Sequence, residues 1–200
     1  MFNIFQRNTA LYDIIDKELL TDTNSAFTPI CEFPSQKMMY QLLSQHDVGC
    51  KFLLAWMKEC PSLFAASGED LFFKKYAQSA FQNLCSNAHG LEFLWKLIDN
   101  NINILEDACP LMLSWTVSNS EHMFLSHVLA ENSQYGHELL YLYLTYEPHA
   151  INLLSMQMIE GGTLNPGGRM KENLRMSKTG EKILELYWEH NQSNGAFFSF

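Results

Sequence analysis

The sequence predicts an all-α protein of stacked helix hairpins, arranged as an irregular α-solenoid or a compact helical-repeat bundle. Three observations support this prediction. Apolar residues recur at helical spacing, glycine or proline falls near the ends of these segments, and one stretch recurs 41 positions later, from Gln41 to Gln82. The 200 residues are 47% apolar and 13% aromatic, which is typical of one folded globular domain and not of a disordered chain.

Four segments carry the helical spacing. Each has two adjacent apolar residues, a gap of two, and two more. Because successive residues advance by about 100° around an α-helix, this spacing forms one buried stripe. The stripes are Phe52-Leu53/Trp56-Met57, Phe93-Leu94/Leu97-Ile98, Phe124-Leu125/Val128-Leu129 and Leu139-Leu140/Tyr143-Leu144. Their starts are 41, 31 and 15 residues apart, so the last two are expected to be consecutive helices. Chance is an open alternative, since an apolar helical chain also produces such patterns.

Glycine and proline mark the expected ends of these helices. Gly49, Gly90 and Gly136 each stand three residues before a stripe, and we interpret them as the turn between two helices. Pro61 and Pro148 lie nine residues after the start of their stripes, where a proline does not extend a helix interior.

The remaining elements are expected in the following order. Residues 8–20 form a helix and 21–34 a loop rich in polar residues and proline. Residues 69–85 and 110–117 are the first helices of the second and third hairpins, with Pro110 at a helix start.

A glycine-rich run, 161–168, is the clearest break in the chain, since it holds four of the ten glycines. After it, the stripe Ile183-Leu184/Tyr187-Trp188 predicts a final helix that packs back onto the protein. The predicted organisation is a helical-repeat domain at 1–160, a Gly-rich linker and basic segment at 161–178, a C-terminal helix at 179–191 and a tail at 192–200.

About 25 residues of the chain resemble an ankyrin repeat. Gly90-Leu-Glu-Phe-Leu-Trp-Lys-Leu-Ile-Asp-Asn-Asn-Ile-Asn103 is similar to the second helix and following loop, and Cys109-Pro-Leu-Met112 to the Thr-Pro-Leu-His opening. The chain departs from the family because Gly90 to Pro110 is too short for its period of about 33 residues. Met112 also replaces the histidine, and the other copies lack the Pro-Leu opening. The resemblance implies helix pairs stacked in a solenoid.

The charge is unevenly distributed around a net value of −9. Between Lys96 and Arg169 there is no lysine or arginine, whereas this region holds eight acids, and such a region repels nucleic acid. The five cysteines are odd in number and lack a C-x-x-C pair, which indicates a reducing, cytoplasmic location without disulfides or a zinc module. No Sec signal and no run of about 18 apolar residues is present, so no membrane span is expected.

Seven histidines do not form a recognisable metal or catalytic pattern. His122 and His127 are five residues apart, whereas a zinc-protease helix needs four with a glutamate between them. Cys85 and His89 have i, i+4 spacing, but cysteine at this position is interpreted as core. We therefore expect no cofactor and no metal. An enzyme with a dispersed site among Cys85, His89, His122 and His127 is kept as an alternative.

Stacked helix hairpins expose extended surfaces that bind other macromolecules, so the first hypothesis is a protein-interaction module. The acidic region from Asp99 to Glu147 is expected to contact a basic partner protein. A self-associating structural protein is a further alternative, and the oligomeric state is left open. The candidate partner-binding residues are Asp99, Glu106, Asp107, Trp95 and Glu121. Trp95 falls in the gap of its stripe, where it is either a surface hot spot or packed against the next repeat.

The C-terminal part has two further features. Five basic residues lie between Arg169 and Lys182, and they are expected either to contact the protein's own acidic body or to be solvated. The end of the chain resembles the translocation signal of type IV-secreted bacterial effectors, which implies delivery into a host cytosol. This resemblance rests on Glu181, Glu185, Glu189, Phe197, Phe198 and Phe200.

Overall fold

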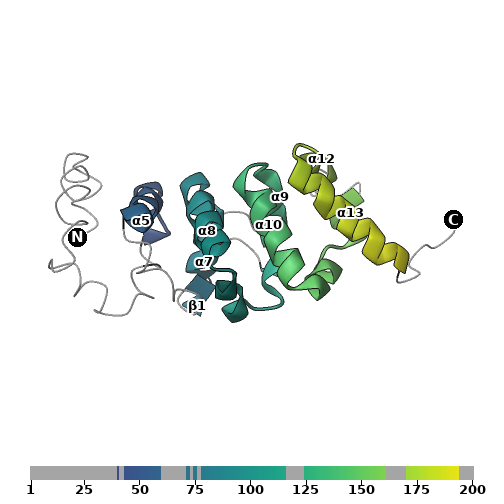
Figure 1. The fold of residues 1–200 in the computed structure, drawn as a ribbon, viewed down its shortest axis with the longest axis horizontal. Coiled ribbons are helices and arrows are strands. Elements are labelled where there is room, and N and C mark those ends of the chain that lie inside the picture. The colour runs from purple at the N-terminus through teal and green to yellow at the C-terminus, as the bar shows by residue number, and fades with distance from the viewer. Residues whose placement is uncertain are drawn as a thin grey trace. The chain divides into compact units, whose positions relative to one another are not determined.

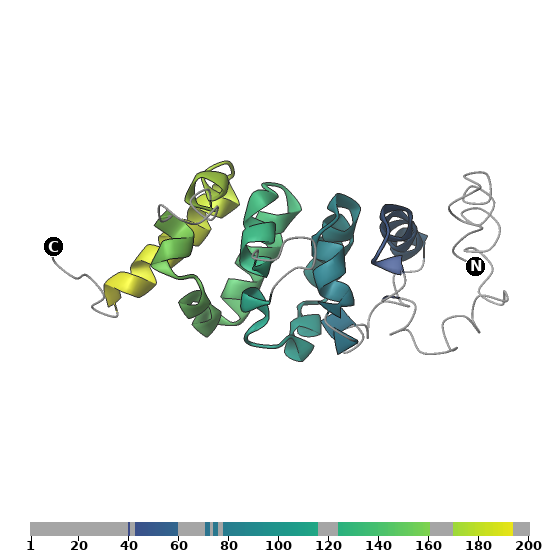
Figure 2. The ribbon, with the colours of Figure 1, turned by 180° about the vertical axis from the view of Figure 1, so that it is seen from behind.

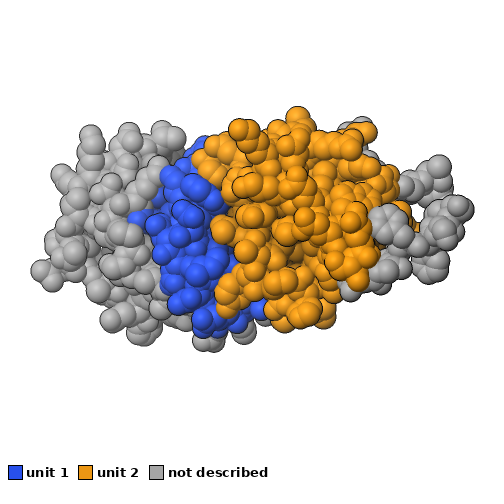
Figure 3. Space-filling view, turned by 45° about the vertical axis from the view of Figure 1, so that its right-hand side comes forward, with its two compact units in different colours: residues 1–108 blue, residues 109–200 orange. Residues whose placement is uncertain are grey.

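The computed structural model describes residues 40, 43–59, 71–72, 74–75, 78–115, 124–160 and 170–193. Almost all of these residues are helical or connect helices that pack on each other (Figure 1), so the all-α prediction is confirmed. One antiparallel ladder of two residues on each side pairs β1 (Lys74–Lys75) with β2 (Gln78–Ser79). The chain divides into two compact units, residues 1–108 and 109–200, which Figure 3 distinguishes by colour. This boundary lies inside the region 1–160 that the sequence suggested as one domain.

The helices of the described part of unit 1 lie around α8 (Ala88–Asn100). This helix packs against α5 (Asp47–Glu59) and α7 (Ala80–Cys85), and it leads into the 3-10 helix η3 (Ile102–Asp107). Its apolar stripe forms the core, and the four predicted residues are all at most 4% exposed: Phe93, Leu94, Leu97 and Ile98. The stripe of α5 also faces inward, since Leu53 and Met57 are buried.

Unit 2 contains two helix hairpins. The first pairs α9 (Leu125–Glu131) with α10 (Tyr135–Tyr146), and the second pairs α12 (Met170–Leu174) with α13 (Lys178–Ser193). The hairpins stack in register, because α9 contacts α12 and α10 contacts α13 (Figure 2). This packing buries three residues of the apolar stripe that was predicted for the final helix: Ile183, Leu184 and Tyr187.

Short elements precede the first hairpin of unit 2 and follow it. A 3-10 helix, η4 (Met112–Ser114), contacts α9. A second one, η5 (Pro148–Leu153), follows α10 directly and begins at a proline, as the position of Pro148 predicted for a helix end. The short helix α11 (Met156–Glu160) contacts α12.

Four glycines follow a leucine at nearly constant distance. The pairs are Leu43 and Gly49, Leu84 and Gly90, Leu129 and Gly136, and Leu174 and Gly180. Each leucine carbonyl lies against its glycine so closely that a Cβ on the glycine would overlap the oxygen. The same carbonyls accept hydrogen bonds from the backbone N–H groups of His46, Asn87, Asn132 and Ser177, at 3.1 to 3.5 Å. We call this arrangement the Leu–Gly contact.

The Leu–Gly contact corrects the interpretation of these glycines as turn residues. Gly49, Gly90 and Gly136 lie inside the first turn of α5, α8 and α10, not between two helices, and Gly180 has the same position in α13. Glycine is needed because the preceding turn passes directly over its Cα. Measured from these glycines, successive hairpins are 41, 46 and 44 residues apart, which is more regular than the spacing of the stripes.

The predicted lengths of two helices, the first helices of the second and third hairpins, are wrong. The long helix at 69–85 is replaced near its end by the β1–β2 ladder, and α7 begins at Ala80. Ser79 starts it as a capping box, since its Oγ accepts from the Gln82 N–H at 3.2 Å and Gln82 Oε1 accepts from the Ser79 N–H at 2.9 Å. In 110–117, the described part forms only the single turn η4. The stripe at Phe124 instead forms α9, the first helix of the α9–α10 hairpin.

Candidate functional site

Three of the predicted partner-binding carboxylates lie at one end of unit 1. Asp99 is the penultimate residue of α8, and Glu106 and Asp107 close the η3 helix that packs against α8. All three are exposed. We call these three residues the acidic end. Helix α8 makes the electrostatic potential at the acidic end more negative, because its C-terminal carbonyls carry partial negative charge and its last turn holds no basic residue.

The described lysine side chains of α5 and α8 do not neutralise the acidic end. Lys51 pairs with Asp47 at 2.7 Å, and Lys96 pairs with Glu92 at 2.8 Å, each at i, i+4 spacing within one helix. Among the described side chains of unit 1, no ion pair involves Asp99, Glu106 or Asp107. The acidic end therefore presents three carboxylates to solvent.

An apolar side chain lies in the same segment. Ile102, the first residue of η3, is 38% exposed, while its neighbours Ile104 and Leu105 are buried. Trp95 is half-buried in α8, so it is neither a fully exposed hot spot nor a core residue. Glu121, the fifth predicted binding residue, lies outside the described residues.

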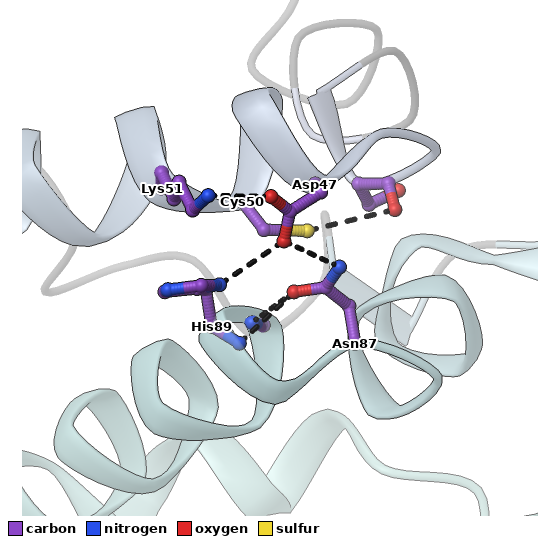
Figure 4. Close-up of polar contacts among 7 residues, drawn as sticks. Asp47, Cys50, Lys51, Asn87 and His89 are labelled. Carbon is purple, nitrogen blue, oxygen red and sulfur yellow. Dashed lines mark hydrogen bonds and ion pairs between the residues drawn. The ribbon is translucent and has the colours of Figure 1, made fainter.

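A polar cluster that the sequence did not predict joins α5 to α8 (Figure 4). One oxygen of Asp47 accepts hydrogen bonds from Asn87 Nδ2 at 3.1 Å and lies 3.0 Å from His89 Nδ1. The other oxygen pairs with Lys51, and this contact and that of Asn87 lower the pKa of Asp47 to about 2. Asn87 also caps α8, since its Oδ1 accepts from the N–H groups of His89 and Gly90.

An equivalent cluster joins the two hairpins of unit 2. Ser177 caps α13, because its Oγ accepts from the Gly180 N–H at 3.0 Å, and it also lies 2.6 Å from Nδ1 of His137. Thr179 donates to the carboxylate of Glu138. The two clusters have the same layout. The residues three and one before Gly90 contact the first turn of α5, and the residues three and one before Gly180 contact the first turn of α10.

Three of the four residues of the enzyme alternative are described, Cys85 and His89 in unit 1 and His127 in unit 2. Cys85 is 1% exposed, and burial raises the pKa of its thiol well above the ordinary value, so it is not a nucleophilic thiolate. His89 faces Asp47 instead. His127 lies in unit 2, where its Nδ1 is buried without a hydrogen-bond partner, and burial lowers its pKa. His122 lies outside the described residues.

The basic segment is partly used inside unit 2. Lys171 pairs with both carboxylate oxygens of Glu160 at 2.7 and 2.8 Å and lies over the Trp188 ring. Lys182 lies over the Tyr141 ring. These contacts favour the interpretation in which the basic residues contact the protein's own body.

Of the residues proposed for secretion, Glu181, Glu185 and Glu189 are exposed on α13, and residues 194–200 lie outside the described part. The effector resemblance and the cytoplasmic location stay predictions. Among the described residues, no helix has the length and apolar character required to cross a membrane. The same residues contain no group of three or more His, Cys, Asp and Glu side chains suited to a metal ion. Searches of protein-family models, curated proteins and solved structures find no match to this chain.

Proposed function

We propose that this protein is a protein-interaction module whose acidic end contacts a basic surface of a partner protein. The observation that carries the proposal is the group of three exposed carboxylates at the junction of α8 and η3, which no described lysine or arginine pairs with. A partner with lysine or arginine side chains would supply the missing counter-charges.

The composition of this surface supports a protein partner. Ile102 offers an apolar contact between Asp99 and Glu106, and interfaces combine such a contact with a surrounding rim of polar groups. The helical elements hold the backbone of the acidic end in place, because Leu97, Ile98, Ile104 and Leu105 anchor α8 and η3 in the core. A pre-formed surface binds at a lower cost in conformational entropy than a disordered acidic segment.

The test begins with affinity capture from a cytosolic lysate by the full chain at about 50 mM salt, followed by purification of the captured protein. Binding is then measured by calorimetry for the wild type and for the triple variant D99K/E106K/D107K. We expect the triple variant to weaken binding by about tenfold or more, because attraction becomes repulsion between like charges. Raising the salt to about 500 mM should weaken the wild type and leave the variant less affected.

A charge-matched control separates this surface from net charge. The variant E181K/E185K/E189K reverses three exposed acids on α13 of unit 2, so it changes the total charge by the same amount. If the two variants weaken binding of the partner equally, the partner responds to net charge alone, and this result contradicts the proposal. So does a partner whose affinity is unaffected by reversal at the acidic end.

A further inference from the structure

A fully buried histidine connects the two hairpins of unit 2. His137 lies in the first turn of α10 and is 0% exposed. Its Nε2 lies 2.8 Å from the carbonyl oxygen of Ala130 in α9, and its Nδ1 lies 2.6 Å from Oγ of Ser177, the residue before α13. Because a carbonyl oxygen only accepts, Nε2 carries the proton, and Ser177 donates its hydroxyl proton to Nδ1.

The groups around His137 are hydrogen-bonded as a neutral imidazole requires. Ser177 Oγ accepts from the Gly180 N–H at 3.0 Å and lies against Nδ1, to which it can donate its own proton. Gly180 packs on the imidazole, and a Cβ at that position would lie 2.8 Å from Nδ1. The hydrogen-bond chain from Ala130 through His137 and Ser177 to Gly180 thus fits a neutral imidazole, and an imidazolium would require the Ser177 hydroxyl proton to turn away from the ring.

A proton on Nδ1 would disrupt this chain. The imidazolium has two N–H donors and no acceptor, so Ser177 could no longer donate its hydroxyl proton to the ring. The charge would also be buried, which is costly unless an acidic partner compensates for it. Release of α13 from α10 would hydrate the imidazolium and remove both penalties.

The charged groups around His137 do not supply a buried counter-ion. Glu138 is next in sequence, but its carboxylate accepts from Thr179, and its attraction for the imidazolium is smaller than the effect of burial, which lowers the pKa of His137. The other charged groups of the packed helices are exposed to solvent or engaged in contacts of their own. They are Glu131 on α9, Lys171, Glu172 and Arg175 around α12, and Lys178, Glu181, Lys182, Glu185, Glu189 and His190 on α13.

We propose that the α10–α13 contact is an acid-sensitive joint, at which protonation of His137 releases the α12–α13 hairpin from the α9–α10 hairpin. This inference is independent of the acidic end in unit 1.

The direction of the pH effect follows from proton binding. The pKa of His137 is below 6.5 when it is buried and returns to about 6.5 when the joint opens. The closed joint therefore binds fewer protons and is favoured above about pH 6.5. As the pH falls below that value, the opening equilibrium should increase about tenfold per pH unit until the pKa of the closed form is reached.

Hydrogen–deuterium exchange of the full chain at about pH 7.5 and about pH 5.5 tests the joint. Rates are corrected for the chemical effect of pH on amide exchange. We expect protection in α13 and in the first turn of α10 to fall at the lower pH, by up to about tenfold, while α8 in unit 1 stays protected. Equal protection of α13 at both pH values would overturn the proposal.

Three variants assign the effect to one histidine. H137Q keeps a neutral donor for Ala130 and should remove the acid sensitivity of α13. H149Q, at an exposed position of the same unit, should retain it. H127Q addresses a second histidine of unit 2, which is half-buried, since burial lowers the pKa of His127 as well. If acid sensitivity is lost in H127Q and kept in H137Q, His127 controls opening and the proposal is wrong.

A direct titration keeps the test valid if H137Q fails to fold. The imidazole of His137 in the wild-type protein is followed by NMR as the pH is lowered. We expect a pKa below 6.5, with its transition accompanied by loss of α13 protection. Titration of His137 at or above 6.5, with the helix still protected, would overturn the proposal.

Discussion

The Leu–Gly contact predicts that Gly90→Ala destabilises the protein, although alanine is the better helix former. In an exposed helix this substitution stabilises by about 1 kcal/mol. At Gly90 the added Cβ would overlap the carbonyl oxygen of Leu84, which is backbone and already accepts the Asn87 N–H at 3.1 Å. Relief of the clash requires α7 and α8 to separate where Leu84, Leu91 and Leu94 are all at most 3% exposed.

The two effects can be compared in size. Overpacking of a core costs about 1–3 kcal/mol, and a rigid backbone neighbour places Gly90 in the upper part of that range. After subtraction of the helix-propensity gain, we expect a net loss of about 2 kcal/mol in the free energy of unfolding. Urea denaturation of the full chain, followed by far-ultraviolet circular dichroism, measures this quantity.

Ala88→Gly is the matched control for that measurement. Ala88 lies in the same turn of α8 and is exposed, so the reverse substitution there tests propensity without a steric contact. We expect it to destabilise by about 0.5–1 kcal/mol. If Gly90→Ala leaves stability unchanged or increases it, the close approach of the two helices is not the reason for the glycine.

Three further predictions concern the polar cluster and the thiols of the protein. Asn87→Ala removes both the cap of α8 and a donor to Asp47, so it should lower the free energy of unfolding by about 1–2 kcal/mol in urea denaturation; an unchanged midpoint would contradict the capping role. Because the pKa of Asp47 is lowered to about 2, its stabilising contribution should be complete above about pH 4 and lost as the pH falls toward 2; carboxyl NMR titration checks this, and a pKa near 3.8 contradicts it. Burial raises the pKa of Cys50 to about 12 and that of Cys85 as well, so iodoacetamide at about pH 8 should modify the partly exposed Cys109 before either of them in the native protein, as judged by peptide mass spectrometry; labelling of Cys85 first would be the opposite result.

The apolar stripes predicted the second helices well, because burial on one face leaves a periodic pattern in the local sequence. Phe93, Leu94, Leu139 and Leu140 are all buried where the pattern placed them. The stripe at Phe124 was also a correct helix, and with the next stripe it forms the consecutive helices α9 and α10 that their close spacing predicted. Stripes alone do not distinguish the two helices of a hairpin, so the spacing measured from them is irregular.

The positions of the glycines give the spacing of the hairpins that the stripes do not give. The sequence around each glycine could not show which structural role the glycine has. A glycine before an apolar run is compatible with a turn or with a close helix contact, and only the position of the preceding leucine carbonyl distinguishes these. Aligning the chain on Gly49, Gly90, Gly136 and Gly180 would have revealed the equivalent hairpins.

The exposed acids could be predicted from charge distribution, whereas the polar clusters could not. Asp99 was expected to contact a partner because it begins an acidic region in which no lysine or arginine follows Lys96 until Arg169. The contacts of His89 with Asp47 and of His137 with Ser177 join residues about forty positions apart, and they depend on the stacking of whole hairpins. No short-range pattern specifies that pairing.

The Leu–Gly contact also determines where the chain can change length during evolution. The interval from leucine to glycine is six residues at Leu43, Leu84 and Leu174, and seven at Leu129, where Asn132 Oδ1 accepts from three successive N–H groups across the longer turn. We therefore expect the segments between hairpins to accept insertions more readily than the interval from leucine to glycine. A leucine, five or six residues, a glycine, two residues and two apolar residues therefore form a signature by which diverged relatives of this chain could be recognised after most other positions have changed.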